Sequence, residues 1–184
     1  MLNSQSNQNP QRKLITLYDY HNLEAGFRAQ KKELNMVALR EYFSFGREAV
    51  EHVVYIGTNP LDIEGSIRQL IELRRNGFIV RTKTAKVLPG NKLKCNLDVE
   101  LVIDALDMAE RVSPDIILIA SGDGDFTPLV EKLRFQGIRT EVASVKGTIS
   151  RKLKYSANGY IDLTNIDLSN IDRLEENITL RRAS

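Results

Sequence analysis

Residues 115–120 form a short, almost uninterrupted apolar run, Asp-Ile-Ile-Leu-Ile-Ala, which ends at a glycine-containing turn. A strand that is apolar on both faces is typical of the centre of a parallel sheet, where helices cover both sides. Parallel neighbours cannot be joined by a tight turn and need longer crossover connections, which are usually helices. The run therefore predicts an α/β fold.

The rest of the sequence alternates between strand-like and helix-like segments. Strands are predicted at 14–18, 52–56, 78–82, 139–144 and 160–163. Helices are predicted after Asn22, at 34–45, at 61–76 behind Asn59 and Pro60, from Asp98 to Pro114, at 126–136 and at 150–157. Residues 83–94, with Pro89-Gly90, are compatible with a loop or a β-hairpin. The alternation predicts three layers: a mostly parallel central sheet with helices on both faces.

The length of 184 residues suits one folded domain, which we place at residues 13–164. Residues 1–12 are rich in Asn, Gln and Ser and are predicted to form a disordered tail. Residues 165–184 are predicted to be an extension with a short amphipathic helix, because apolar residues recur at helical spacing at Ile171, Leu174 and Ile178. This extension could pack on the domain, or mediate a homodimer or contact with a protein partner.

Several classes of function are disfavoured by what the sequence lacks. No apolar run approaches membrane-spanning length, and the first residues do not resemble a signal peptide, so we expect a cytoplasmic protein with no membrane partner. Cys95 is the single cysteine, which excludes an intrachain disulfide and a cysteine-based zinc site. His21 and His52 are too few and too far apart for a zinc site. The glycine-rich motifs that bind nucleotide phosphates and the Gly-x-Ser-x-Gly motif of hydrolases are also missing.

Aspartates follow two of the predicted strands and open one of the predicted helices. Asp19 follows the first strand, Asp98 begins a helix, and Asp123 and Asp125 lie in the turn after the apolar run. Functional side chains of such folds gather at the carboxyl ends of the strands, so these carboxylates should converge. Their mutual repulsion would be offset by a hard cation with oxygen ligands, and Mg²⁺ or Mn²⁺ fits best.

Each of these residues also has a plain structural interpretation. Gly-Asp-Gly-Asp by itself is more often an ordinary turn than a metal site. Asp98 and Asn22 can each act as the cap of a helix. Asp104 lies about 240° around the helix from Asp98, so we expect it on a solvated face or supporting the ligands rather than binding the ion directly. The cluster of acids as a whole is what favours a metal site.

Three segments of the sequence resemble the NYN family of PIN-like nucleases, in particular its LabA-like branch. Leu17-Tyr-Asp19-Tyr-His-Asn22 resembles the opening Asp-x-x-Asn motif of that family. Residues 94–104, from Lys94 to Asp104, resemble its helix start, and Ser121-Gly-Asp-Gly-Asp125-Phe resembles its Ser-Gly-Asp-x-Asp-Phe signature. The similarity spans residues 13–163. It departs at Cys95-Asn96-Leu97, where Gly-Val is usual before the aspartate, and at Asn158, where Asp is common.

The resemblance implies a PIN-like, Rossmannoid fold and metal-dependent hydrolysis of RNA phosphodiester bonds. It implies that Asp19, Asp98, Asp123 and Asp125 hold a divalent metal, and that Asn22 orients a ligand or a water molecule. Ser121, like Asp104, would support these ligands. The alternative that the same resemblance leaves open is a LabA-like regulatory or RNA-binding protein with little or no nuclease turnover.

An acidic pocket repels RNA, so a substrate would have to be held by basic residues around it. Two groups of such residues flank the predicted site. The first has no acid between its members, and the second lies near the predicted helix at 150–157; they are Arg81, Lys83, Lys86, Lys92 and Lys94, and Lys146, Arg151, Lys152 and Lys154. Either group could instead be an ordinary solvated surface.

Overall fold

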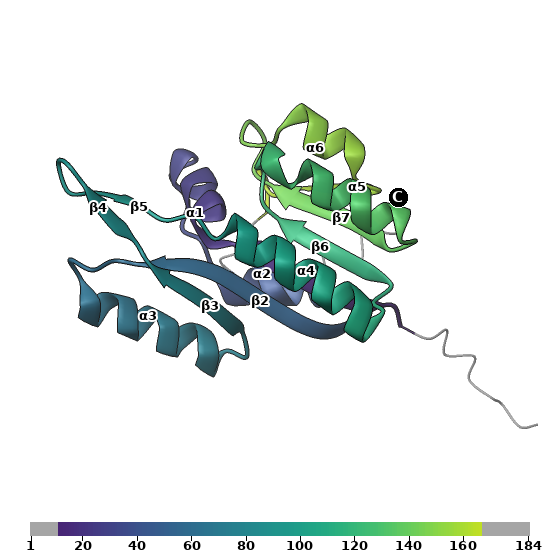
Figure 1. Cartoon of the computed structure of the whole chain (residues 1–184), viewed down its shortest axis with the longest axis horizontal. Coiled ribbons are helices and arrows are strands. Elements are labelled where there is room, and N and C mark those ends of the chain that lie inside the picture. The colour runs from purple at the N-terminus through teal and green to yellow at the C-terminus, as the bar shows by residue number, and fades with distance from the viewer. Residues whose placement is uncertain (1–10, 167–184) are drawn as a thin grey trace, which may run out of the picture.

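The computed structural model describes residues 11–166, and in this part of the chain six parallel strands form one central sheet. The order across the sheet is β3-β2-β1-β6-β7-β8 (Figure 1). The bounds are Lys13–Asp19 for β1, Glu48–Thr58 for β2, Ile79–Thr84 for β3, Ile116–Ala120 for β6, Arg139–Ser144 for β7 and Gly159–Asp162 for β8. Every neighbouring pair is parallel, which confirms the predicted fold class.

The first strand, β1, lies near the middle of the sheet. The chain then adds β2 and β3 on one side of β1, and β6, β7 and β8 on the other. Strands β1 and β6 are therefore hydrogen-bonded neighbours, with Tyr18 beside Ala120. This is the point where the direction of strand addition reverses, and a crevice forms there because the following connections leave on opposite faces. Asp19 and the Ser121–Asp125 turn lie directly beyond this point.

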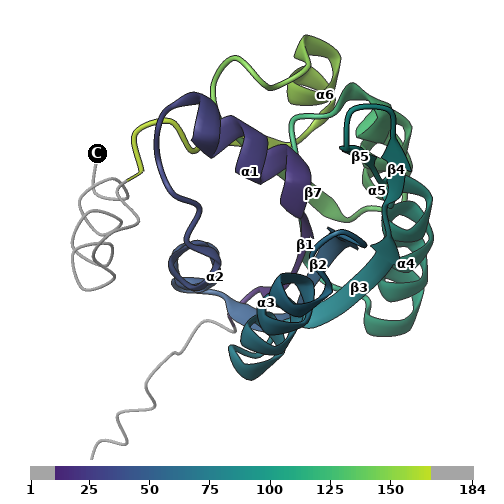
Figure 2. The same cartoon turned by 90° about the vertical axis from the view of Figure 1, so that its left-hand side faces the viewer.

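Within residues 11–166, six α-helices cover the two faces of the sheet (Figure 2). One face carries α1 (Tyr20–Ala29), α2 (Met36–Ser44) and α3 (Ile63–Arg75), and the other carries α4 (Asp98–Val112), α5 (Thr127–Phe135) and α6 (Arg151–Ser156). Strand β1 supplies Leu14 and Tyr18 to the first core and Ile15 and Leu17 to the second. Successive residues of β1 point to opposite faces of the sheet, and both faces are buried. The apolar run of β6 predicted a sheet that is covered on both sides in this way.

Two predicted helix starts were wrong, and in both cases a nearby aspartate provides the cap. Helix α1 begins at Tyr20, and Asp19 rather than Asn22 caps it. Helix α3 begins at Ile63, where Asp62 accepts a hydrogen bond from the Gly65 amide. The predicted start of α4 is confirmed, because Asp98 is its first helical residue; the cap position is Leu97, which makes no side-chain cap hydrogen bond. The side chain of Asp98 therefore does not act as a helix cap.

Residues 86–94 form the hairpin that the sequence left open. Strand β4 (Lys86–Leu88) pairs antiparallel with β5 (Lys92–Lys94), and Gly90 and Asn91 between them have positive φ angles. The hairpin extends away from the body of the domain beyond the end of β3 (Figure 1). It leads directly into Cys95, Asn96 and the start of α4, so it stands beside the carboxyl edge of the sheet.

The tail predicted at 1–12 and the helix predicted in 165–184 lie almost wholly outside the described residues, and both stay predictions. Within residues 11–166, none of the helices has the length and apolar character needed to cross a bilayer. The cytoplasmic location likewise stays a prediction.

Candidate metal centre

Asp19 stands at the end of β1, where its carboxylate connects three parts of the carboxyl edge. Its Oδ1 accepts a hydrogen bond of 3.3 Å from the amide of Asn22, and its Oδ2 accepts one of 2.9 Å from the hydroxyl of Ser121. The first bond caps α1, and the second joins β1 to the end of β6. Both carboxylate oxygens therefore already have a protein partner.

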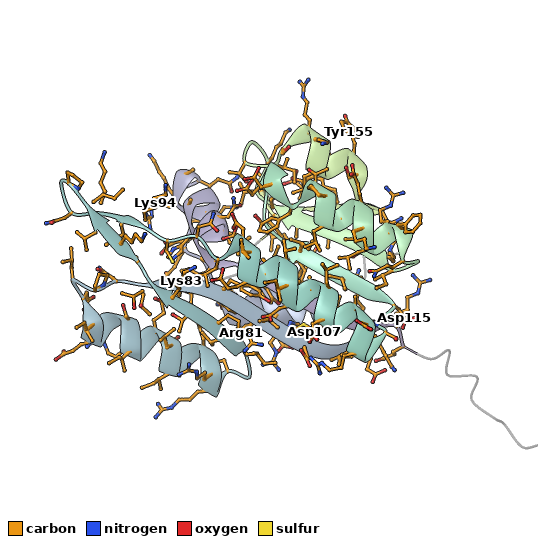
Figure 3. The ribbon with its side chains drawn as sticks, viewed as in Figure 1. Arg81, Lys83, Lys94, Asp107, Asp115 and Tyr155 are labelled. Atoms are coloured by element: carbon orange, nitrogen blue, oxygen red, sulfur yellow. The ribbon has the colours of Figure 1, made fainter. Side chains whose placement is uncertain are left out.

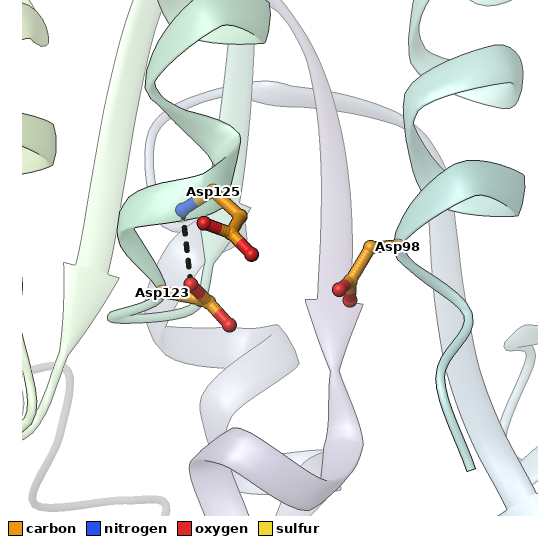
Figure 4. A group of neighbouring side chains, drawn as sticks. All are labelled: Asp98, Asp123 and Asp125. Atoms are coloured by element: carbon orange, nitrogen blue, oxygen red, sulfur yellow. Dashed lines mark hydrogen bonds between the residues drawn. The ribbon is translucent and has the colours of Figure 1, made fainter.

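The turn after β6 is held by hydrogen bonds between its own residues and α1. Asn22 Oδ1 accepts a hydrogen bond of 2.9 Å from the amide of Gly122. Ser121 Oγ accepts one of 3.1 Å from the Asp123 amide, and Asp123 Oδ1 accepts one of 2.9 Å from the Asp125 amide. These bonds set the backbone so that the carboxylates of Asp123 and Asp125 leave the turn on the same side (Figure 4).

The two glycines of the turn are not explained by backbone freedom. Neither Gly122 nor Gly124 has the positive φ angle that would explain a glycine by backbone freedom. Instead, a Cβ on Gly122 would lie 2.4 Å from the carbonyl oxygen of Thr148. The glycine lets the 148–150 segment pack against the turn, where the amide of Ser150 donates a hydrogen bond of 2.9 Å to the Gly122 carbonyl.

Asp98 reaches the same region from the first turn of α4. The side chain of Asn96 holds it from both sides: Asn96 Nδ2 donates to Asp98 Oδ2 at 2.6 Å, and Asn96 Oδ1 accepts from the Asp98 amide at 2.8 Å. Asn96 belongs to the segment that departs from the family motif. Its amide therefore has a clear local task, which is to fix the rotamer of the aspartate two residues later.

Asp98, Asp123 and Asp125 form one carboxylate cluster, which we call the acid cluster (Figure 4). Each offers one oxygen, and these oxygens lie within 4.8 Å of one another. Asp19 is adjacent rather than a member: it lines a cavity of about 210 Å³ together with Asp98 and Asp123. The structure thus brings three of the four predicted ligands into one group and places the fourth on the wall of the same cavity.

The electrostatics of the acid cluster are compatible with a bound cation. Burial is the main reason that the pKa of Asp98 is raised, and the charges of Asp123 and Asp125 raise it further. Burial also raises the pKa of Asp19, although the hydrogen bonds from Ser121 and Asn22 oppose this. A divalent cation would offset the repulsion, and the oxygen-only donor set suits Mg²⁺ or Mn²⁺. The residues present therefore fit the group that the sequence predicted.

Asp104 is connected to the site through Tyr55. The Tyr55 hydroxyl donates a hydrogen bond of 3.0 Å to Asp104 Oδ2, and Tyr55 lines the same cavity as Asp98. Asp104 also accepts a bond of 2.7 Å from Arg81 Nε. It is placed to orient Tyr55 and Arg81 rather than to contact an ion bound at the acid cluster.

The predicted basic residues differ in how free they are to bind an anion (Figure 3). Arg81 and Lys83 are ion-paired with Asp104 and Glu100 of α4, each at 2.7 Å, so the absence of acids between them in the sequence was misleading. Lys86, Lys92 and Lys94 lie exposed on the hairpin.

In the second basic group, Arg151 and Lys152 are the first residues of α6, directly after the Ser150 that contacts the turn. The Lys146 amide donates to Thr164 Oγ1, and the Lys154 ammonium lies 4.6 Å from the centre of the Tyr160 ring.

The cavity is also lined by residues that the sequence did not single out as site residues. His21, Tyr55 and Cys95 line the cavity with the aspartates. His21 Nε2 accepts a hydrogen bond of 3.0 Å from the Gly57 amide and so ties α1 to the end of β2. His21 lies just after the end of a predicted strand, so its position in the sequence could have identified it as a site residue. Tyr55 lies inside a predicted strand, and its position gives no such indication.

A larger cavity, of about 720 Å³, lies elsewhere, between α1, α2, α3 and Ile166. None of Asp19, Asp98, Asp123 and Asp125 lines it. Among the described residues, a group of three carboxylates gathers only beside the smaller cavity, so its chemistry rather than the volume of the larger cavity marks the candidate site.

The parallel α/β sheet, with acids gathered at its carboxyl edge, is a PIN-like fold. The family model of the NYN domain matches residues 13–168, which is most of the chain. The protein therefore belongs to the NYN domain family, as the motifs predicted.

The chain is also similar to two known proteins. The chain is 37% identical over 126 residues to the low amplitude and bright protein LabA of Synechococcus elongatus, and the match covers 65% of each of the two proteins, slightly less than two thirds. The crystal structure of a protein of unknown function from Vibrio parahaemolyticus superimposes with a TM-score of 0.73 at 24% identity, covering 85% of this chain and 96% of that one. The second comparison shows the shared fold.

Proposed function

We propose that the protein is a Mg²⁺- or Mn²⁺-dependent ribonuclease that hydrolyses RNA phosphodiester bonds at the acid cluster. The observation that carries this proposal is the approach of the Asp98, Asp123 and Asp125 oxygens to within 4.8 Å at the carboxyl edge of the sheet. Membership of the NYN family supports the same reaction class. A fold alone does not establish an activity, so the acids carry the argument.

Asp98, Asp123 and Asp125 would hold the cation, and Asp19 would complete the site from the wall of the cavity. When bound, Mg²⁺ or Mn²⁺ supplies a water molecule of lowered pKa for attack on phosphorus and offsets negative charge on the phosphate oxygens.

The remaining residues of the site act by holding these carboxylates in place. Asn22 and Ser121 fix the turn that carries Asp123 and Asp125, and Asn96 fixes Asp98. Each acts through a hydrogen bond to a backbone amide or a carboxylate, which keeps the oxygens close despite their repulsion. Asn22 therefore orients ligands through the turn, and Asp104 acts through Tyr55.

The hairpin supports RNA as the substrate, because it concentrates positive charge beside the site. Lys86 and Lys94 are directly opposite each other across the strands, and Lys92 lies opposite Leu88 on the same face. Like charges in direct cross-strand pairs destabilise a sheet unless an anion lies between them. In the described part of the chain, no carboxylate forms an ion pair with any of these three lysines. A phosphate backbone laid along this face would supply the missing charge.

The proposal is tested by incubating a labelled single-stranded RNA with the purified chain after chelator treatment, and again after adding back Mg²⁺ or Mn²⁺. Cleavage is expected only with the metal. A substrate whose 2′-hydroxyls are replaced by hydrogen separates a general phosphodiesterase from a ribonuclease.

A second candidate function is an RNA-binding or regulatory protein with little turnover. It is favoured by Asp19, whose two carboxylate oxygens are both engaged by Ser121 and Asn22. In that case RNA would be retained by the basic residues without metal-dependent cleavage, and the same experiment, read by gel shift, would show binding alone.

A further inference from the structure

Helix α3 carries a line of exposed isoleucines that its own domain does not cover. Ile63, Ile67 and Ile71 are 64%, 50% and 42% exposed, and their spacing of four residues places them in one row along the helix. Only Leu73 of this helix is buried, with Leu70 partly buried beside it. Single exposed apolar residues are common, but a row of three on one helix marks an interaction surface.

The isoleucine row faces outward from the edge of the sheet. Gln69, on another side of α3, donates a hydrogen bond of 2.7 Å to the Tyr20 hydroxyl of α1, which lies toward the middle of the domain. At 100° per residue, Ile67 and Ile71 point about 160° away from Gln69. The row is therefore on the flank of α3 remote from α1, and α3 itself lies beside the edge strand β3 (Figure 1).

We propose that this row is the interface of a homodimer, in which α3 packs antiparallel against α3 of a second copy. A two-fold axis near Ile67 would pair Ile63 of each copy with Ile71 of the other, so the row is complementary to itself. The charges of the helix favour the same arrangement. Glu64 lies in its first turn and Arg74 and Arg75 in its last, and the antiparallel arrangement brings these opposite charges together across the interface.

The neighbouring edge strand argues for helix packing rather than a continuous sheet through two copies. An antiparallel pair of β3 strands centred on Thr82 would place Arg81 of each copy opposite Lys83 of the other. Charged side chains on an edge strand commonly prevent strand pairing, and Arg81 and Lys83 are such residues although Asp104 and Glu100 pair with them. The interface is thus small and built on two helices, and we expect association in the micromolar range or weaker.

The two acid clusters stay open in this dimer. Antiparallel packing of α3 reverses the direction of the strands between the copies, so the carboxyl edges point in opposite directions. Association and RNA cleavage are therefore separable, and the inference goes beyond the proposed function without depending on it.

The test is the mass of the full chain in solution, measured by sedimentation velocity from roughly 1 to 500 µM. The wild-type chain is expected to shift from monomer to dimer over this range. Ile67→Glu, which places two like charges at the axis, is expected to weaken the dimer at least about tenfold. Phe135→Glu is the matched control: it puts the same charge on an apolar residue of α5 that is 88% exposed, and it should leave association unchanged.

Two further variants identify the geometry and the competing surface. Arg75→Glu should weaken the dimer, and adding Glu64→Lys should restore it, because the reversed charges attract again only in an antiparallel pair. Ile171 belongs to the C-terminal extension, and Ile171→Glu should have no effect on dimer formation. The proposal is overturned if the wild-type chain is monomeric at every concentration. It is also overturned if Ile67→Glu still dimerises while melting like the wild type, or if Ile171→Glu abolishes the dimer.

Discussion

The side-chain oxygen of Asn22 accepts a hydrogen bond of 2.9 Å from the amide of Gly122, one residue before the acidic part of the turn. This bond joins the first turn of α1 to the connection after β6, although the two residues are 100 positions apart in the sequence. The amide of Gly122 is buried, so the bond also satisfies a group that water cannot reach.

Replacing Asn22 with Ala should disturb the acid cluster without removing any carboxylate. The unpaired Gly122 amide should lower the free energy of unfolding by about 1–2 kcal/mol. The affinity for Mn²⁺ should fall as the turn loosens, which titration calorimetry can measure. Asn59→Ala removes a similar side-chain bond to a backbone amide in an exposed turn, and should leave Mn²⁺ binding as it was.

Gly122→Ala should be far more damaging than Gly124→Ala. At Gly122 the new methyl group meets the Thr148 carbonyl at 2.4 Å, and this backbone must move. At Gly124 the nearest atom is the Ser150 hydroxyl, at 2.8 Å, which can rotate away. We expect a loss of about 2–3 kcal/mol for the first variant, and less than half of that for the second, by chemical denaturation. Equal losses would mean that the 148–150 segment does not pack as described.

The fold was predictable because it depends on patterns that are local in the sequence. The apolar run at 116–120 and its helical neighbours required a parallel sheet, and the sheet in turn required Asp19 and the 121–125 turn to meet. What local patterns could not supply were the contacts that choose between similar polar residues. Asn22 and Asp19 both suited a helix cap, and the distant Ser121 and Gly122 decide their roles.

The charged residues show the same limit. Arg81 and Lys83 looked free because no acid lies near them in sequence, yet α4 brings Glu100 and Asp104 to them from the next element of the fold. Conversely, Asn96 seemed only a departure from a motif, and its two bonds to Asp98 became visible when the start of α4 was in place. Pairing of this kind depends on tertiary contacts.

Stability should fall in acid because of His52. This side chain is buried between the Tyr18 hydroxyl and Ser44, and burial lowers its pKa to about 4, with a smaller contribution from Arg40. Its pKa is lower in the folded state than in the unfolded state, so the unfolded chain takes up the proton first as the pH falls. Between pH 6.5 and 4 the resulting loss should reach about 3 kcal/mol. His52→Gln should show a flatter profile in urea unfolding over this range.

Asp98→Asn should stabilise the metal-free protein at neutral pH. Burial, aided by Asp123 and Asp125, raises the pKa of Asp98 in the folded state, so its contribution to stability is greatest below its unfolded pKa and is lost as the pH rises through the folded pKa. Removing the charge removes this cost and should raise the melting temperature by a few degrees. The further rise that Mn²⁺ gives the wild type should disappear, because a ligand is missing. A lower melting temperature without metal would show that the carboxylates do not strain the fold.

Metal-dependent cleavage of one labelled single-stranded RNA by a matched pair of variants tests the proposed function most directly. Asp123→Asn removes a carboxylate of the acid cluster, whereas Asp107→Asn removes one from the exposed side of α4, where it pairs with Arg111 (Figure 3). The proposed mechanism predicts that Asp123→Asn loses at least about 100-fold in rate while Asp107→Asn cleaves like the wild type. Cleavage that persists in Asp123→Asn, or that proceeds equally well in chelator, would contradict it.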